Sequence, residues 1–290
     1  MVESSQGTHA GPNVFSVDLE DWYQGLEIDM TEWGRFAPRL AHGLDPLLEL
    51  LDEAKVKATF FILGWEAERA PDTVRRLAAA GHEIASHGWS HRMVYRLTAS
   101  EFRDEIRRSR DLLRSLSGQP VIGYRAPYFS ITGDSLWALD VLVEEGFLYD
   151  SSIFPTFNYR YGIPGAGRRP GWITTPGGAR LFEIPLSTVR APAGINLPLG
   201  GGGYFRLYPY AVTRQLARHL TTREHQPLIF YVHPWEYDPD QPDVPMPRRV
   251  PKLTHYLNLA STYAKTRRLL RDFRFTTMDG AFRGTFQPAA

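Results

Sequence analysis

Two histidines four residues apart, His87 and His91, are the side chains of this 290-residue sequence best suited to chemistry. They end the segment Gly81–His91 (GHEIASHGWSH), which follows an alanine-rich helical run. Residues 83–86 are typical of a short strand, and Gly88 favours a tight turn directly after it. Such a turn brings both imidazoles to one side, where they form half of a metal site. Two surface or capping histidines would show the same spacing, so the pair needs a carboxylate and catalytic partners from elsewhere.

Three carboxylates in four residues, Asp18, Glu20 and Asp21, follow a short apolar strand expected at Asn13–Val17. Clustered carboxylates at the end of a strand are costly unless they are solvated or bind a cation. Two imidazole nitrogens, one carboxylate oxygen and a water describe a catalytic site of the zinc type. The early carboxylates therefore complete the site that the two histidines begin, and a second carboxylate there remains for use as a base.

Three more polar groups, Arg125, Asp150 and His233, follow apolar strands farther along the chain. Arg125 can hold one early carboxylate through a bidentate pair. His233 can serve as a general acid, with Asp150 orienting its ring and raising its pKa. With a metal-activated water, this set predicts hydrolysis of an acyl bond to nitrogen or oxygen. Taken singly, each has another interpretation: a surface ion pair for Arg125, a strand-end histidine for His233, and a turn or N-cap for Asp150.

Strands and helices alternate roughly every 25–40 residues, which predicts parallel strands and a (β/α) barrel. The carboxyl ends of all strands in such a barrel open on one rim, so the polar groups converge there. Asp45 and Pro46 fit the N-cap and first position of one helix, and Thr98 with Glu101 forms a capping-box pattern before another. Strands are expected at 58–63, 121–124, 181–184, 228–232 and 275–278, and helices at 45–55, 71–80, 98–116, 134–145, 209–220 and 253–271.

Composition sets the broad class. The net charge is +1 and 43% of the residues are hydrophobic, so a full core is expected, with no nucleic-acid or membrane-surface partner. There is no cysteine, so a transition metal must use histidine or carboxylate ligands. Residues 1–12 are polar and read as a flexible leader, and no apolar run is long enough to cross a membrane. We expect a soluble, cytoplasmic protein; the sequence does not indicate its oligomeric state.

Aromatic residues make up 13% of the chain, and many stand beside polar residues in expected loops. Trp22, Trp89 and Trp235 each lie next to a candidate site residue. Aromatic faces in a cleft suit the C–H faces of sugar rings, so these three are candidate substrate-binding residues. Packing of long loops is the other interpretation, and composition alone favours it.

The order and spacing of these groups resemble the polysaccharide deacetylase (NodB-homology) superfamily. The segment HGWSH matches that family's H-[ST]-x-x-H signature, with Gly88 where serine or threonine is usual, and residues 125–128 (RAPY) match its R-x-P-[YF] motif. His233 matches the family's acid histidine. The resemblance implies a distorted (β/α)7 barrel over residues 13–290 as one domain, with a short C-terminal extension from about 238.

The same resemblance implies roles for individual residues. Asp18 would be the base with Arg125 as its partner, and His233 the acid supported by Asp150. The backbone N–H near Tyr128 would stabilise the tetrahedral oxyanion. The metal would be Zn²⁺, with Co²⁺ or Ni²⁺ also suited to the ligands.

Two departures from the family pattern concern the ligand and the acid. Adjacent aspartates are usual in the first motif, but here the order is Asp18-Leu19-Glu20-Asp21. Strand alternation puts Glu20 on the side of Asp18, whereas residue type favours Asp21. We expect Asp21 to be the ligand, with Glu20 as the alternative. Asp150 also lacks the Asp-Trp pair that often follows it in the family.

A narrower resemblance is to deacetylases associated with exopolysaccharide production and the exosortase system, through Gly200–Arg206 (GGGGYFR) and Trp235–Asp279. It implies an intracellular enzyme that acts on a glycan or its lipid-linked precursor. Our main hypothesis is a zinc-dependent deacetylase that removes N-acetyl groups from N-acetylhexosamine in a bacterial polysaccharide. The glycine run itself predicts a backbone crossing near a ligand or a flexible loop.

Three other functions stay open. An allantoinase-like hydrolase of cyclic imides would have a closed pocket rather than an open aromatic groove. A non-haem iron oxygenase uses a similar ligand triad, but the strand–helix alternation argues against it. A catalytically silent glycan-binding protein would need to lose the function of Asp18 or His233, and both residues are present.

Overall fold

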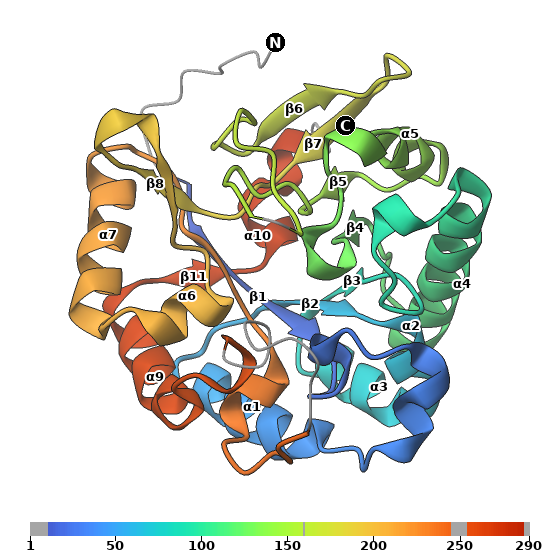
Figure 1. The fold of residues 1–290 in the computed structure, drawn as a ribbon, viewed down its shortest axis with the longest axis horizontal. Coiled ribbons are helices and arrows are strands. Elements are labelled where there is room, and N and C mark those ends of the chain that lie inside the picture. Colours follow the sequence, from blue (N-terminus) through green and yellow to red (C-terminus); the bar gives the residue numbers. More distant parts are fainter. Residues whose placement is uncertain (1–10, 159, 245–253, 287–290) are drawn as a thin grey trace.

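A computed structural model describes residues 11–158, 160–244 and 254–286. Its parallel strands form a curved sheet that helices surround, which confirms the expected distorted (β/α)7 barrel (Figure 1). The parallel strands pair in the order β10 (Ile229–Val232), β1 (Asn13–Leu19), β2 (Thr59–Ile62), β3 (Glu83–Ser86), β4 (Gly123–Tyr124), β5 (Tyr149–Asp150) and β7 (Arg180–Glu183). Strand β6 (Gly171–Thr174) runs antiparallel on β7, and β11 (Phe275–Thr276) pairs with the start of β1.

The helices agree with most of the sequence expectations. The expected capping box is confirmed at α4: the Thr98 hydroxyl accepts from the Glu101 N–H at 3.2 Å, and the Glu101 carboxylate accepts from the Thr98 N–H at 2.8 Å. Residue 253 and the leader residues 1–10 lie outside the described residues. The helices are α1 (Leu40–Glu53), α2 (Gly64–Arg69), α3 (Pro71–Ala79), α4 (Ala99–Ser117), α5 (Trp137–Glu144), α6 (Gly202–Leu207), α7 (Tyr210–Thr222), α9 (Thr262–Asp272) and α10 (Met278–Phe286).

Helix α1 begins five residues before the expected start at Asp45. Asp45 is therefore not its N-cap, and Pro46 lies inside the helix. The early start is held from a distance, because the Asp21 carboxylate accepts hydrogen bonds from the N–H groups of Arg39 (2.7 Å) and Leu40 (3.1 Å). Those are N–H groups that the first turn of a helix leaves without a partner.

The barrel is distorted where β7 and β10 would close it. In the described residues these two strands are not paired, and the segment between them carries the hairpin β8 (Thr188–Arg190) and β9 (Asn196–Pro198). The Gly200 carbonyl accepts from the N–H of Tyr231 at 2.6 Å, and Gly201 pairs with the same residue of β10. A Cβ at Gly201 would overlap the Tyr231 carbonyl oxygen, so the glycine run is a close backbone crossing.

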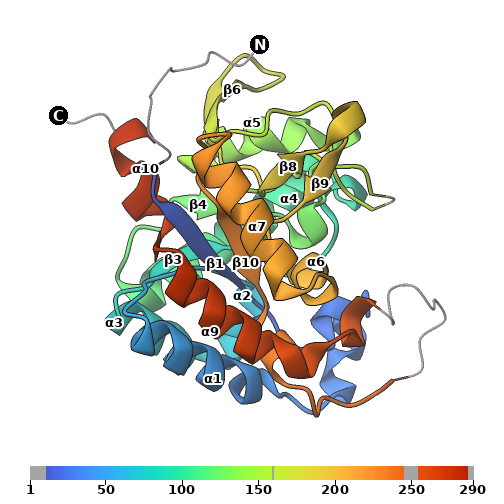
Figure 2. The ribbon, with the colours of Figure 1, turned by 90° about the vertical axis from the view of Figure 1, so that its left-hand side faces the viewer.

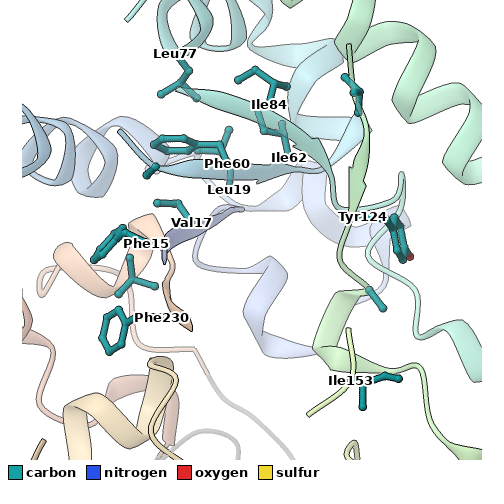
Figure 3. Packing of buried hydrophobic residues seen from close by; sticks show 14 of the residues in the cluster. Phe15, Val17, Leu19, Phe60, Ile62, Leu77, Ile84, Tyr124, Ile153 and Phe230 are labelled. Atoms are coloured by element: carbon teal, nitrogen blue, oxygen red, sulfur yellow. The ribbon is translucent and has the colours of Figure 1, made fainter. Parts of the chain in front are cut away.

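Side chains of β1 alternate between the core and the barrel interior. Phe15, Val17 and Leu19 pack with Phe60 and other apolar residues under the helices (Figure 3). Burying each of these side chains stabilises the fold by about 1.5–3 kcal/mol. The even-numbered residues, including Asp18, face the other way because successive strand residues point to opposite sides. No helix in the described part of the chain is long and apolar enough to span a bilayer.

Candidate active site

Asp18 and Arg125 form a buried ion pair inside the barrel. The Arg125 Nη1 lies 2.6 Å from Asp18 Oδ1, and both side chains are at most 3% exposed. Arg125 also donates to the hydroxyls of Ser16 (2.9 Å) and Ser151 (3.0 Å), and its guanidinium lies 4.1 Å over the Phe61 ring. The structure therefore places the two residues together as the sequence predicts, with the guanidinium fixed on every side.

Glu20, His87 and His91 form a buried cluster at the carboxyl ends of β1 and β3. One ligand-capable atom from each residue lies within 4.8 Å of the others. Their burial is unusual for such polar groups, since Glu20 and His87 are each 2% exposed and His91 is 7% exposed. His91 adopts a left-handed conformation (φ +56°), which turns its ring toward the carboxylate. Two nitrogens and one oxygen arranged in this way suit zinc, cobalt or nickel.

The donor atoms of this cluster fit a cation better than a network of hydrogen bonds. His91 Nε2 lies 2.6 Å from Glu20 Oε2, yet that oxygen has no partner with hydrogen-bond geometry in the described residues. His87 Nδ1 donates to the Arg125 carbonyl at 2.8 Å, so its Nε2 is free to coordinate. Trp235 Nε1 donates to the second oxygen of Glu20 at 3.0 Å. His87 and Glu20 are thus each oriented by a second hydrogen bond, as ligands in protein metal sites are.

Burial and neighbouring charges set the protonation of this cluster. Burial lowers the pKa of His87 to about 4, which keeps its imidazole neutral. Burial alone would raise the pKa of Glu20, but the imidazoles of His91, His233 and His87 hold that pKa well below its usual value. A neutral imidazole and an ionised carboxylate are the forms that bind a divalent metal.

Glu20 rather than Asp21 is the carboxylate of the cluster, so the expectation for Asp21 is corrected. Both Asp21 oxygens accept backbone N–H groups, Oδ1 from Trp22 (2.7 Å) and Oδ2 from the first residues of α1. The alternation of side-chain direction along β1 continues for one residue past the last strand residue, Leu19. It therefore directs Glu20 into the barrel beside Asp18. Asp21 is turned outward to start the helix.

His233 is supported by Glu236, not by Asp150. His233 Nδ1 donates to Glu236 Oε1 at 2.7 Å, and Glu236 Oε2 accepts from Arg206 Nε at 2.8 Å. Burial would lower the pKa of His233, but the carboxylates of Glu20 and Glu236 raise it above its usual value. Its Nε2 faces the site, 3.5 Å from Glu20 Oε1 and 4.0 Å from Asp18 Oδ2.

Asp150 lies on β5, and none of its hydrogen bonds in the described residues reaches His233. Its oxygens accept from the hydroxyl (2.6 Å) and the N–H (3.1 Å) of Ser152. It pairs across the sheet with Glu183, and burial raises the pKa of both carboxyl groups. The role expected for Asp150 is therefore corrected: it shapes the loop after β5.

Of the three candidate tryptophans, Trp235 alone lines the pocket. Trp22 is 1% exposed, packs edge-on against Phe36 and donates to the Ala37 carbonyl. Trp89 is covered by the Arg108 guanidinium, 3.4 Å from its ring centre. Both are corrected to packing residues, whereas Trp235 stacks between the rings of His233 (4.8 Å) and His255 (4.1 Å).

A pocket of about 380 Å³ opens over these groups. Its floor holds Asp18, Glu20, His87, His91 and His233, and its walls are mainly aromatic. Tyr128 is one wall: its ring lies 4.4 Å from that of His91, and its hydroxyl donates to the Gln24 carbonyl at 2.8 Å. Half of the lining comes from three segments after β5, namely residues 158–161, 203–207 and 254–257.

Sequence reasoning missed Glu236, Arg206 and His255. The spacing His233-Pro-Trp-Glu236 was a usable signal, because an acid three residues after a histidine in a helical turn faces it. Arg206 and His255 had no comparable signal, since they reach the site from segments that are distant along the chain.

Comparisons with known proteins divide the chain into two parts. Residues 38–142 match the family described as polysaccharide deacetylase, and residues 151–283 match a domain of unknown function (DUF3473). Residues 18 and 20 precede both matches, His87, His91 and Arg125 fall in the first, and Arg206, His233 and Glu236 in the second.

Among curated proteins, a peptidoglycan-N-acetylglucosamine deacetylase of Bacillus cereus is 37% identical over 95 residues, 32% of this chain and 34% of that protein. The chain spans about a third of the length of the curated relatives it matches.

Two solved structures show the same fold along nearly the whole chain. One, described as a polysaccharide deacetylase of Mycobacterium smegmatis, has a TM-score of 0.62 and 20% identity, with 97% of this chain and 92% of that chain covered. The other, Puue allantoinase, has a TM-score of 0.57 and 18% identity, with 99% and 96% covered. At these identities the likeness establishes the fold alone.

Proposed function

We propose that this chain, whose residues 38–142 match the polysaccharide deacetylase family, is a metal-dependent hydrolase that removes N-acetyl groups from N-acetylhexosamine units of a bacterial polysaccharide. One observation carries the proposal: the Glu20–His87–His91 cluster shares a pocket with His233 and with Asp18, which Arg125 holds from below the pocket lining. Ligands, base and acid on one pocket floor are what hydrolysis of an amide requires.

In the first half of the reaction, the metal ligands and the base have separate roles. Glu20, His87 and His91 would hold a divalent ion, best Zn²⁺, which when bound lowers the pKa of a water and polarises a carbonyl. Asp18 accepts the proton of the attacking water. Arg125 holds the Asp18 carboxylate in place, because the buried ion pair costs several kcal/mol to break.

His233 performs the second half of the reaction. The Glu236 carboxylate accepts a hydrogen bond from the Nδ1–H of His233, which leaves Nε2 facing the pocket floor. The protonated ring can then deliver a proton to the leaving amine of the sugar. The backbone N–H near Tyr128 remains the predicted donor to the oxyanion, and Trp235 offers its rim to a sugar ring from the stack with His233.

A cyclic-amide hydrolase is the second candidate, because one observation favours it. The segments after β5 enclose the site, and a pocket of about 380 Å³ accepts a small ring as well as a sugar. Aromatic walls beside the hydroxyls of Tyr128 and Tyr204 suit a sugar better than a planar imide.

Acetate release from acetylated glycans tests the proposal. The purified chain would be incubated with N-acetylglucosamine oligosaccharides and, separately, with allantoin and cyclic imides, each with added zinc and with chelator. We expect zinc-dependent acetate release from the oligosaccharides and no ring opening. Ring opening without acetate release would favour the cyclic-amide hydrolase, and activity unchanged by exhaustive chelation would refute a metal-dependent mechanism.

A further inference from the structure

Positive charge is concentrated in one part of the chain. Residues 151–230 contain nine arginines and two glutamates, with no lysine or aspartate, a formal net charge of +7. The remaining residues contain 24 basic and 30 acidic residues, a formal net charge of −6. The overall +1 conceals this asymmetry, and a charge imbalance between parts of a chain points to a charged partner.

Several of these arginines are exposed without an acidic partner. Arg169, Arg190, Arg218 and Arg223 are exposed, and none forms an ion pair within the described residues. The Glu224 carboxylate already binds Arg168 at 2.7 Å and accepts from the Arg190 N–H at 3.2 Å, and Glu183, the other acid, is buried. This region therefore presents uncompensated positive charge to solvent.

The exposed large apolar side chains lie in the same region. In the described residues they are Phe157 (83% exposed), Ile195 (60%), Leu207 (54%), Val212 (41%) and Leu197 (36%). They all fall between residues 157 and 212, whereas the other large apolar side chains that the structure describes are at least partly covered. Grouped exposed apolar residues mark a contact surface.

Hydrogen bonds tie the apolar and basic residues together. The Asn196 side chain donates to the Pro155 carbonyl at 2.7 Å, which brings the β8–β9 hairpin beside the loop that carries Phe157. Arg190 donates to the Asn196 side chain at 2.8 Å on the same hairpin. The hairpin and α7 lie side by side on one face of the molecule in both views (Figures 1 and 2). Val212 and Arg218 are both exposed on α7.

We propose that this α7–hairpin surface, formed by Phe157, Ile195, Leu197, Val212, Arg190, Arg218 and Arg223, docks on an anionic lipid bilayer. Arginines attract the anionic headgroups, and the apolar side chains enter the interface between them, as in other proteins that lie on membranes. A soluble polyanion would use the arginines but leave Phe157 and Ile195 exposed, so the combination favours a bilayer.

The position of the surface connects it to the pocket. Phe157 precedes the pocket-lining Asn158, and Leu207 itself lines the pocket and is 54% exposed. Docking on the bilayer would therefore hold the pocket mouth close to the lipid headgroups.

Vesicle co-sedimentation tests the proposal with the full chain. Vesicles would contain phosphatidylglycerol and phosphatidylcholine in equal parts, or phosphatidylcholine alone. We expect binding to the anionic vesicles that weakens as salt is raised. The double variant Arg218→Gln/Arg223→Gln should lower the affinity about 25-fold, since each basic residue at an anionic surface contributes roughly fivefold. Ile195→Ser should weaken binding further at high salt, where the apolar contact dominates.

A matched control removes two arginines from the opposite side of the barrel. Arg96 and Arg114 are exposed and form no ion pair within the described residues, and α4, which carries Arg114, lies across the molecule from α7 (Figure 1). Arg96→Gln/Arg114→Gln should keep at least half of the wild-type affinity. Equal losses in the two double variants would overturn the proposal, because net charge alone would then explain binding. It would also fail if anionic vesicles do not bind while dextran sulfate does.

Discussion

Replacing one carboxylate oxygen by an NH₂ group, at Glu20 and separately at Asp21, distinguishes the candidate metal ligand from the residue that caps α1. In Glu20→Gln the oxygen facing His91 becomes half of a neutral amide, a poor ligand. In Asp21→Asn an NH₂ group would face the N–H donors of α1 or of Trp22. We therefore expect the first change to remove metal binding and the second to weaken the fold.

The contacts of Glu20 and Asp21 set the expected size of the loss in metal affinity and of the loss in stability. Substituting a residue that only hydrogen-bonds to a metal ligand lowers metal affinity about 10–100-fold. Substituting the ligand Glu20 itself should therefore lower zinc affinity by at least about 100-fold, or roughly 2.7 kcal/mol. Asp21 accepts three N–H groups, two of them at the start of α1. Losing that cap should lower the free energy of unfolding by about 2 kcal/mol, and Tm by roughly 4 °C.

Zinc titration calorimetry and thermal unfolding with and without chelator would measure the two effects. Zinc should raise the Tm of the wild type and of Asp21→Asn, but leave that of Glu20→Gln unchanged, because a ligand stabilises only the fold that binds it. Asp29→Asn, a matched change at the exposed cap that accepts from the Thr31 N–H, should alter neither reading. Zinc affinity lost in Asp21→Asn and kept in Glu20→Gln would refute the assignment.

Three other changes test the remaining groups. Asp18→Asn should keep the zinc affinity but lower kcat about 10²–10⁴-fold, the usual contribution of a general base; unchanged acetate release would exclude Asp18 from that role. Glu236→Gln should lower the raised pKa of His233, so the alkaline limb of the pH–rate profile should move to lower pH; an unmoved limb would count against their coupling. Burial raises the pKa of Glu66 to about 8 from 4.5. The folded state therefore keeps a proton that the unfolded chain releases, and stability should fall by roughly 3–5 kcal/mol between pH 4.5 and 8. Glu66→Gln should flatten this slope in unfolding experiments, and an equal slope in both proteins would contradict it.

Sequence reasoning succeeded where spacing and strand ends alone determine position. Convergence of Asp18, His87, Arg125 and His233 follows from parallel strands whose carboxyl ends share a rim, and the structure brings these groups together. The capping box at Thr98 is also local, since both partners lie within one turn.

The misplaced residues depended on contacts distant in sequence. The choice between Glu20 and Asp21 is decided by the start of α1, nineteen residues later, where Asp21 is needed as the cap. Strand ends and the family resemblance both pair Asp150 with His233, but Glu236 fills that place from the turn after β10, and Arg206 fixes Glu236 from α6. The three-residue spacing of His233 and Glu236 is a local signal, but no periodicity or local motif encodes the contact of Arg206 with Glu236.

The site residues are divided between the two matched segments, so each comparison informs only part of the chemistry of the site. His87, His91 and Arg125 lie in residues 38–142, the part matched by the polysaccharide deacetylase family. His233, its supporting residues and most of the pocket lining come from residues 151–283. Resemblance over the first part bears on the two histidine ligands and on Arg125, whereas the shape that selects a substrate belongs mostly to the second. Specificity should therefore respond to changes at Tyr204 and His255 that leave metal affinity untouched, because neither residue contributes to the Glu20–His87–His91 cluster.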